Sequence, residues 1–124
     1  MGERFIRPKI TVRSTGIPGR HIATARANHV VVDDGAAHGG PGEAVGASEL
    51  FLMGIATCAT MMMERIACAE GLDLQRVEVE MESLFDMEAK RSGPPVLDRA
   101  RIVFRMAGID ETKAREMVEA YKRY

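Results

Sequence analysis

Cys58 and Cys68 are the two cysteines of this 124-residue chain, and their thiols are the side chains best suited to nucleophilic or redox chemistry. Both lie in one stretch that reads as a single helix, so they are separated by roughly 15 Å at a rise of 1.5 Å per residue. That separation excludes a disulfide between them. A catalytic thiol reacts as the thiolate, which needs positive charge nearby. Packing is the more usual role of a cysteine in an apolar helix, although a redox role stays open for Cys58, and Cys68 is expected to be structural.

The helix that carries both thiols is expected to begin at Ser48, whose hydroxyl can cap a first-turn N–H, and to end at Gly71, because glycine readily adopts the left-handed conformation. It is apolar on nearly every side. A helix of roughly 20 residues could also span a membrane. Polar residues interrupt it, however, at Ser48, Glu49, Thr57, Thr60, Glu64 and Arg65. We therefore predict a core helix that is covered on more than one side, in part by a second subunit.

The composition argues against several classes of function. A net charge of −1 and the lack of a basic run leave no electrostatic footprint for nucleic acid. No signal peptide or lipidation motif is present, and two free thiols favour a reducing cytoplasm. The length indicates one domain over residues 1–124. No membrane association is expected.

Metal and cofactor sites are not expected either. His21, His29 and His38 have no metal-ligand spacing with either cysteine. The glycine-rich segment 38–42 lacks the lysine and the strand-to-helix context of a phosphate-binding loop. We interpret that segment as a connector or a flexible lid.

The hydrophobic pattern predicts an α+β chain. Strands are expected at 9–13, 21–25 and 29–33, then a loop over 34–46, the long helix, strands at 76–82 and 99–106, and a second helix from Asp110. Glutamates line the outer face of the fourth strand and arginines that of the fifth, which predicts an antiparallel pair. The order is therefore β-β-β-α-β-β-α. A turn is expected at 92–95.

This order, together with the motif at 40–58 (GPGEAVGASELFLMGIATC), resembles the OsmC/Ohr family of osmotically inducible and organic hydroperoxide resistance proteins. The resemblance implies an intertwined homodimer in which two sheets wrap two long central helices, with active sites at the subunit interface. Many members reduce organic hydroperoxides with two cysteines. The first attacks the peroxide from the central helix, and its counterpart here is Cys58.

The chain departs from the family pattern at two positions. The second, resolving cysteine would fall at or just after Tyr124, and Cys68 does not match it. The chain either lacks its closing strand or is a one-cysteine member. Ser48 occupies the position of the glutamate found in the strict hydroperoxide-reductase branch, whereas Glu49 resembles other OsmC-like branches. Those branches also use an arginine of the N-terminal hairpin, where Arg20 lies.

Two functional hypotheses follow from the resemblance. The first is a thiol-dependent peroxidase of the oxidative-stress response, with Cys58, Glu49 and Arg20 as catalytic residues, no cofactor, and an external thiol as reductant. The second is a non-enzymatic OsmC-fold module that binds a small apolar ligand at the dimer interface. On the simplest alternative, Glu49 serves only the helix dipole and Arg20 is a solvated turn residue.

Overall fold

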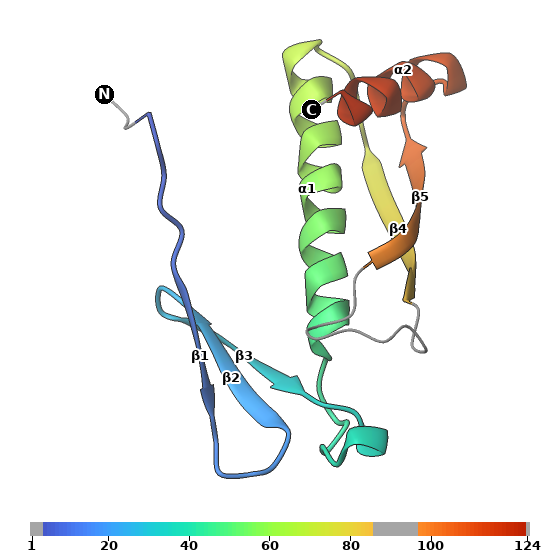
Figure 1. Cartoon of the computed structure of the whole chain (residues 1–124). Helices are drawn as coiled ribbons and strands as arrows, with labels where there is room; N and C mark the ends of the chain where they lie inside the picture. The colour runs from blue at the N-terminus through green and yellow to red at the C-terminus, as the bar shows by residue number, and fades with distance from the viewer. Residues whose placement is uncertain (1–3, 86–96, 124) are drawn as a thin grey trace. The chain divides into compact units, whose positions relative to one another are not determined.

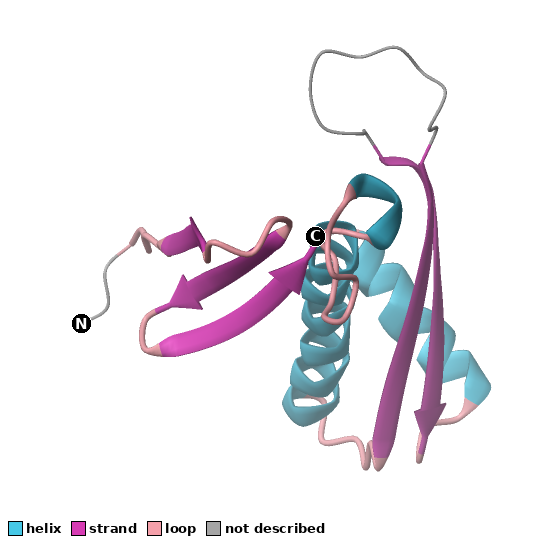
Figure 2. Cartoon of the chain, turned by 90° about the horizontal axis from the view of Figure 1, so that it is seen from below, coloured by secondary structure: helices cyan, strands magenta, loops and turns pink. Residues whose placement is uncertain are grey.

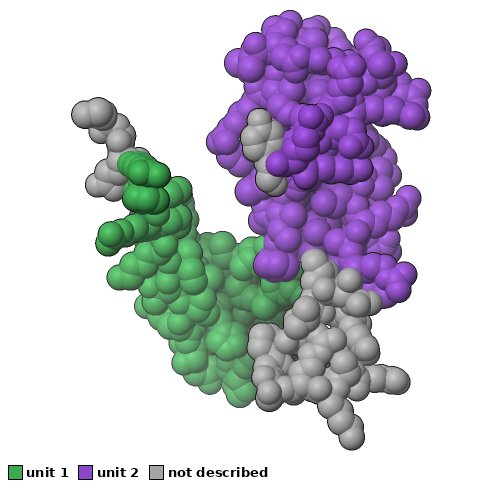
Figure 3. Space-filling view, turned by 45° about the horizontal axis from the view of Figure 1, so that its top comes forward, with its two compact units in different colours: residues 1–50 green, residues 51–124 purple. Residues whose placement is uncertain are grey.

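The computed structural model describes residues 4–85 and 97–123 and has the predicted α+β element order (Figure 1). The elements are the strands β1 (Ile10–Ser14), β2 (Arg20–Ala25) and β3 (Asn28–Asp33), a 3-10 turn η1 (Ala36–His38), the helix α1 (Ala47–Ala69), the strands β4 (Arg76–Phe85) and β5 (Leu97–Ala107), and the helix α2 (Glu111–Lys122). The chain forms two compact units, residues 1–50 and 51–124, which are coloured separately in Figure 3. The turn predicted at 92–95 lies outside the described residues.

The first unit contains an antiparallel meander in the order β1-β2-β3. All three strands begin within one residue of the predicted positions. Across the second pair, Arg20 lies opposite Asp33, and Ile22 lies opposite Val31. Val32 and Asp33 are the buried residues at the end of β3. The meander therefore buries one apolar and one acidic residue at the point where the chain leaves the sheet.

The start of α1 differs from the prediction. The helix begins at Ala47, so Gly46 is the cap position and Ser48 is not. The backbone N–H of Leu50 donates to the carbonyl of Gly46 at 3.0 Å, and the side chain of Glu49 accepts from the N–H of Gly46 at 2.8 Å. This bond is the glutamate half of a capping box, in which the side chain at the third helical position accepts from the backbone N–H of the cap residue.

The end of α1 is as predicted. Gly71 has φ +65°, and the N–H groups of Gly71 and Leu72 donate to the carbonyls of Cys68 and Ala67 at 3.3 and 2.8 Å. This pair of bonds is a Schellman motif, in which the glycine takes the left-handed conformation that other residues avoid.

Within this chain, α1 is buried along one stripe only. Its fully buried residues are Ala59, Met63 and Ala67, which recur every four residues and so share one face. The prediction of cover on more than one side is not met by this chain alone, because Phe51 and Met61 remain 56% and 41% exposed. The reason is that β4, β5 and α2 supply cover for one face.

The second unit has its core where α1 and α2 lie against one face of the β4–β5 ladder (Figure 2). Met63 of α1 and Met117 of α2 are its largest fully buried side chains. Phe104 of β5 packs edge-on against Tyr121 of α2, with ring centroids 5.6 Å apart. Asp110 caps α2 by accepting from the N–H of Lys113 at 2.9 Å.

The predicted charge complementarity between β4 and β5 is confirmed. The strands are antiparallel, with Glu78 opposite Arg105 and Glu82 opposite Arg101. Nη1 of Arg105 lies 3.3 Å from Glu78 Oε2, and its Nη2 lies 3.6 Å from Glu80 Oε2. These exposed pairs fix register more than they add stability.

Candidate functional site

The two thiols lie on exposed parts of α1. Cys58 is near the middle of the helix and Cys68 is in its last turn, and both are free and exposed within this chain. Cys58 is therefore not packed within the single chain, because the buried stripe runs along Ala59 and Met63 instead. An exposed thiol is open to reagents and to substrate, whereas a packed one is not.

Arg20 is the first residue of β2, directly after the turn that follows β1, and its guanidinium is committed to acidic partners. Its Nε and Nη2 donate to the two carboxylate oxygens of Asp33, each at 2.8 Å. Nη2 also reaches Oε1 of Glu43 at 3.3 Å. The side chain is 26% exposed, so the expectation of a solvated turn residue does not describe it. The two parallel bonds to Asp33 fix both its position and its plane.

Asp33 has a fully buried side chain and accepts two further hydrogen bonds from the backbone. The N–H groups of Glu43 and Ala44 each donate to its Oδ2 at 3.0 Å. The bonds from Arg20, followed by those from the backbone, hold the pKa of Asp33 well below its usual range despite burial. The same pairing raises the pKa of Arg20 above its ordinary value. Asp33 is therefore ionised at physiological pH.

Glu49 lies in the first turn of α1, where its carboxylate accepts from the N–H of Gly46. The structure thus gives Glu49 a capping role, which is close to the alternative that Glu49 serves only the helix dipole. The residue is exposed, so this bond leaves its second oxygen accessible to solvent.

Arg20, Asp33 and Glu49 belong to the same unit, whereas Cys58 belongs to the other unit. Sequence reasoning missed Asp33. The available signal was an acidic pair, Asp33 and Asp34, directly after three valines, but nothing in the pattern tells which acid is buried.

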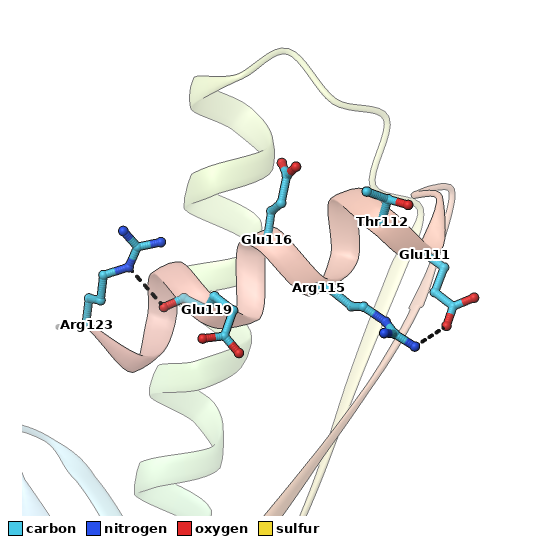
Figure 4. A pocket seen from close by; sticks show the side chains of 6 residues that line it. All are labelled: Glu111, Thr112, Arg115, Glu116, Glu119 and Arg123. Atoms are coloured by element: carbon cyan, nitrogen blue, oxygen red, sulfur yellow. Dashed lines mark hydrogen bonds and ion pairs between the residues drawn. The ribbon is translucent and has the colours of Figure 1, made fainter.

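Other described regions carry different sets of side chains. Among residues 4–85 and 97–123, no three His, Cys, Asp or Glu side chains come close enough to hold a metal ion. An open hollow along α2 is lined by side chains of that helix and its end, with Arg115 paired to Glu111 at 2.7 Å and Arg123 Nε donating to the carbonyl of Glu119 at 3.4 Å (Figure 4). No thiol lines it. A smaller hollow beside Cys68 includes Arg76 in its wall.

Comparisons with known proteins agree on the fold. The structure resembles an OsmC-like protein of Mycoplasma pneumoniae with a TM-score of 0.78 and 15% identity, over 92% of this chain and 79% of that one. It resembles the organic hydroperoxide resistance protein OsmC of Legionella pneumophila with a TM-score of 0.72 and 16% identity, over 94% and 82%. A third likeness, with a TM-score of 0.62 and 18% identity over 97% and 79%, is to a protein assigned to organic hydroperoxide resistance in Vibrio cholerae, with captopril bound in one of its active sites.

A search of curated protein sequences found no match. The family model of OsmC-like proteins matches residues 40–124, which is more than half of the chain and includes α1, β4, β5 and α2. The chain therefore belongs to the OsmC-like protein family.

Proposed function

We propose that this protein reduces organic hydroperoxides with Cys58 and an external thiol. The thiolate attacks one peroxide oxygen, the O–O bond breaks, and the alkoxide takes a proton to leave as the alcohol. Cys58 is then a sulfenic acid. One external thiol condenses with it and releases water, and a second reduces the mixed disulfide. The sum consumes one hydroperoxide and two thiols, and yields one alcohol, one water and one disulfide.

The observation that carries this proposal is the place of Cys58. It is an exposed, free thiol in the middle of the long central helix of an OsmC-like chain. Two of the structural relatives are organic hydroperoxide resistance proteins. The described thiols are unpaired, so we propose a thiol from outside the chain as the reductant. A reducing cytoplasm is the compartment that supplies such thiols.

Arg20 and Glu49 are the proposed charged members of the site. Arg20 supplies the positive charge that a reactive thiolate needs. Glu49 supplies a carboxylate at the start of the helix that bears Cys58. The ion pair with Asp33 partly offsets the positive charge of Arg20.

We propose in addition that the working form is a homodimer. Large apolar side chains on α1 are exposed in the single chain, among them Phe51 and Met53 at 56% and 48%. The helix is long and apolar enough to cross a membrane by length and composition. We propose that α1 is instead the central helix of a folded core, which membership of the OsmC-like family supports. A second copy would cover Phe51 and Met53 and leave access to Cys58, because buried apolar area stabilises association.

Sedimentation velocity tests this assembly. The wild-type protein should sediment as a dimer, and Phe51→Lys should shift it towards monomer. Glu119→Lys, on the exposed side of α2, is the matched control and should leave the dimer intact. A monomeric wild-type protein at micromolar concentration would contradict the proposal.

The peroxidase proposal is tested by comparing the two thiols. The folded protein is treated with limiting cumene hydroperoxide and then with a sulfenic-acid trap, and the label is located by mass spectrometry. Cys58 should be labelled and Cys68 spared. Cys58→Ser should abolish hydroperoxide consumption in the presence of dithiothreitol, while Cys68→Ser should stay within about twofold of wild type, as expected of an exposed residue outside the site.

A ligand-binding module without catalysis is the second candidate function. The presence of captopril in an active site of the Vibrio cholerae relative favours it, because that fold accepts a small molecule. The commitment of Arg20 to Asp33 also favours it. Slow, equal labelling of both cysteines, with consumption no faster than that of a free-thiol control, would leave this candidate standing and remove the peroxidase.

A further inference from the structure

Asp33 lies at the junction between the two segments that carry the proposed charged site residues. It ends β3, and its carboxylate is fully buried in the first unit. A carboxylate offers about four acceptor positions. Asp33 accepts four bonds, two from Arg20 and two from the backbone N–H groups of Glu43 and Ala44, and three of the four fall on Oδ2.

Towards β2, Asp33 holds Arg20. The two residues are directly opposite each other in the ladder, and both bonds of the guanidinium fork measure 2.8 Å. Two hydrogen bonds to one carboxylate fix the orientation of the planar guanidinium, whereas the ammonium group of a lysine would not be oriented in this way. Glu43, in the loop between β3 and α1, also accepts from the guanidinium of Arg20, so this loop contacts the Arg20–Asp33 pair.

Towards α1, Asp33 holds the backbone from which the helix begins. Besides the bonds from Glu43 and Ala44, the N–H of Asp33 itself donates to the carbonyl of Val45 at 2.9 Å. The next residue, Gly46, caps α1 and donates to Glu49. The carboxylate of Asp33 therefore holds Glu43 and Ala44, and its backbone N–H holds Val45, directly before the turn that presents Glu49.

From this geometry we infer that Asp33 is the positioning residue of the hydroperoxide site, orienting Arg20 and the first turn of α1 with Glu49 without touching the substrate. The inference rests on the proposed function, since it takes Arg20 and Glu49 as members of the site. Positioning of this kind matters because a shift of about 1 Å in a catalytic group can lower turnover by ~100-fold.

The chain offers a matched control in Asp34. It is the next residue, it is also an aspartate, and its side chain is 51% exposed. Its Oδ1 accepts from the N–H of Gly35 at 2.9 Å and lies 3.6 Å from Nδ1 of His38, and neither contact reaches Arg20 or α1. Asp33→Asn and Asp34→Asn remove the same charge from adjacent positions. At position 33 the amide also points a donor at groups that are themselves donors.

The experiment uses the full chain with Cys68→Ser, so that alkylation reports Cys58 alone. Folding of each variant is checked by circular dichroism. Three quantities are compared: kcat and KM for cumene hydroperoxide with dithiothreitol, the pH at which the alkylation rate of Cys58 is half-maximal, and amide hydrogen exchange at residues 43–46. Asp33→Asn should lower kcat by up to ~100-fold, move the alkylation midpoint to higher pH, and accelerate exchange at Glu43 and Ala44. Asp34→Asn should leave all three close to wild type.

Two results would overturn the inference. One is a folded Asp33→Asn protein with the kcat, midpoint and exchange of wild type. The other is a midpoint that moves to lower pH with kcat retained, since Asp33 would then only neutralise Arg20. If Asp33→Asn does not fold, Arg20→Lys decides, because it loses the fork while Asp33 keeps its two backbone bonds. A kcat at least about tenfold lower supports positioning, and an unchanged kcat overturns it.

Failure of the proposed function would look different. In that case Cys58→Ser would consume hydroperoxide as fast as wild type, whatever the residue at position 33. The exchange measurement at 43–46 does not depend on activity, so it tests whether Asp33 holds the entry to α1 by itself.

Discussion

Lys113, in the first turn of α2, places its Nζ 2.6 Å from Oε1 of Glu70, the residue that follows α1. Glu116 lies 3.3 Å from the same nitrogen. The contact connects the end of the central helix to the start of the second helix across 43 residues of sequence. It therefore helps to set how α2 sits over the core that contains Met63 and Met117.

Replacing Lys113 with methionine should lower the melting temperature in a pH-dependent way. Glu70, and then Glu116, raise the pKa of Lys113 in the folded protein. The stabilisation is therefore complete below the ordinary lysine pKa, about 10.4, and is lost as pH rises through the higher folded value. Thermal unfolding should show a constant difference between wild type and Lys113→Met near neutral pH, and a shrinking one above about pH 10.4. Lys122→Met, whose Nζ contacts Glu119 within α2, is the control.

Asp33 should contribute stability that is lost in acid, whereas the stability contributed by Lys113 is lost in alkali. Its folded pKa is depressed, mainly by Arg20. The stabilisation is present above the ordinary aspartate pKa, about 3.9, and is lost as pH falls towards the folded value. The gap in melting temperature between wild type and Asp33→Asn should thus be wide at neutral pH and narrow in acid. Asp34→Asn should show a small gap throughout, and an equally wide gap for both variants would contradict the assignment.

Met63→Ala should destabilise the protein by roughly 2–5 kcal/mol, because it removes a fully buried side chain and leaves a cavity. Met61→Ala, on the same helix but 41% exposed, should cost about 0.5 kcal/mol or less in the single chain. Urea unfolding measures both. A loss at Met61 as large as that at Met63 would mean that a second copy covers that face in solution.

Gly108→Ala should be more destabilising than Gly16→Ala. Both glycines have φ +93°, so both substitutions incur backbone strain of about 1–2 kcal/mol. A Cβ at Gly108 would in addition strike the carbonyl oxygen of Asp73, whereas one at Gly16 meets open space. Denaturant unfolding gives the loss of stability of each variant, and the difference between the two losses reports the clash between the new Cβ at position 108 and the carbonyl oxygen of Asp73. Equal losses would show that the turn after β5 can shift away from Asp73.

Glu49→Gln should separate capping from catalysis. Glutamine keeps an acceptor for the N–H of Gly46, so the helix start and the melting temperature should stay near those of wild type. The lost charge should lower hydroperoxide turnover if Glu49 belongs to the site. Glu49→Ala should lower both. Wild-type turnover in a stable Glu49→Gln protein would mean that Glu49 caps the helix and has no catalytic role.

The local elements could be predicted because their signals are local. Alternation in β1 to β5 places each strand close to its observed position, and Gly71 ends α1 because the Schellman turn requires a left-handed residue. The pairing of β4 with β5 followed from opposite charges on their outer faces. The predicted start of α1 was wrong, since Ser48 is a good capping residue by type, but the cap observed is Gly46, two residues earlier, whose N–H donates to Glu49.

The sequence by itself thus determined the element order, the family and the thiol on the central helix. Tertiary structure decided which acidic residue is buried and paired with Arg20, and which face of α1 is covered. Asp33 and Asp34 are identical in type and adjacent in sequence, and only the ladder places Asp33 opposite Arg20 and buries it. A buried carboxylate needs partners from other segments, here β2 and the loop that returns to α1. Those partners lie 10 to 13 residues away along the chain, beyond the reach of any local pattern.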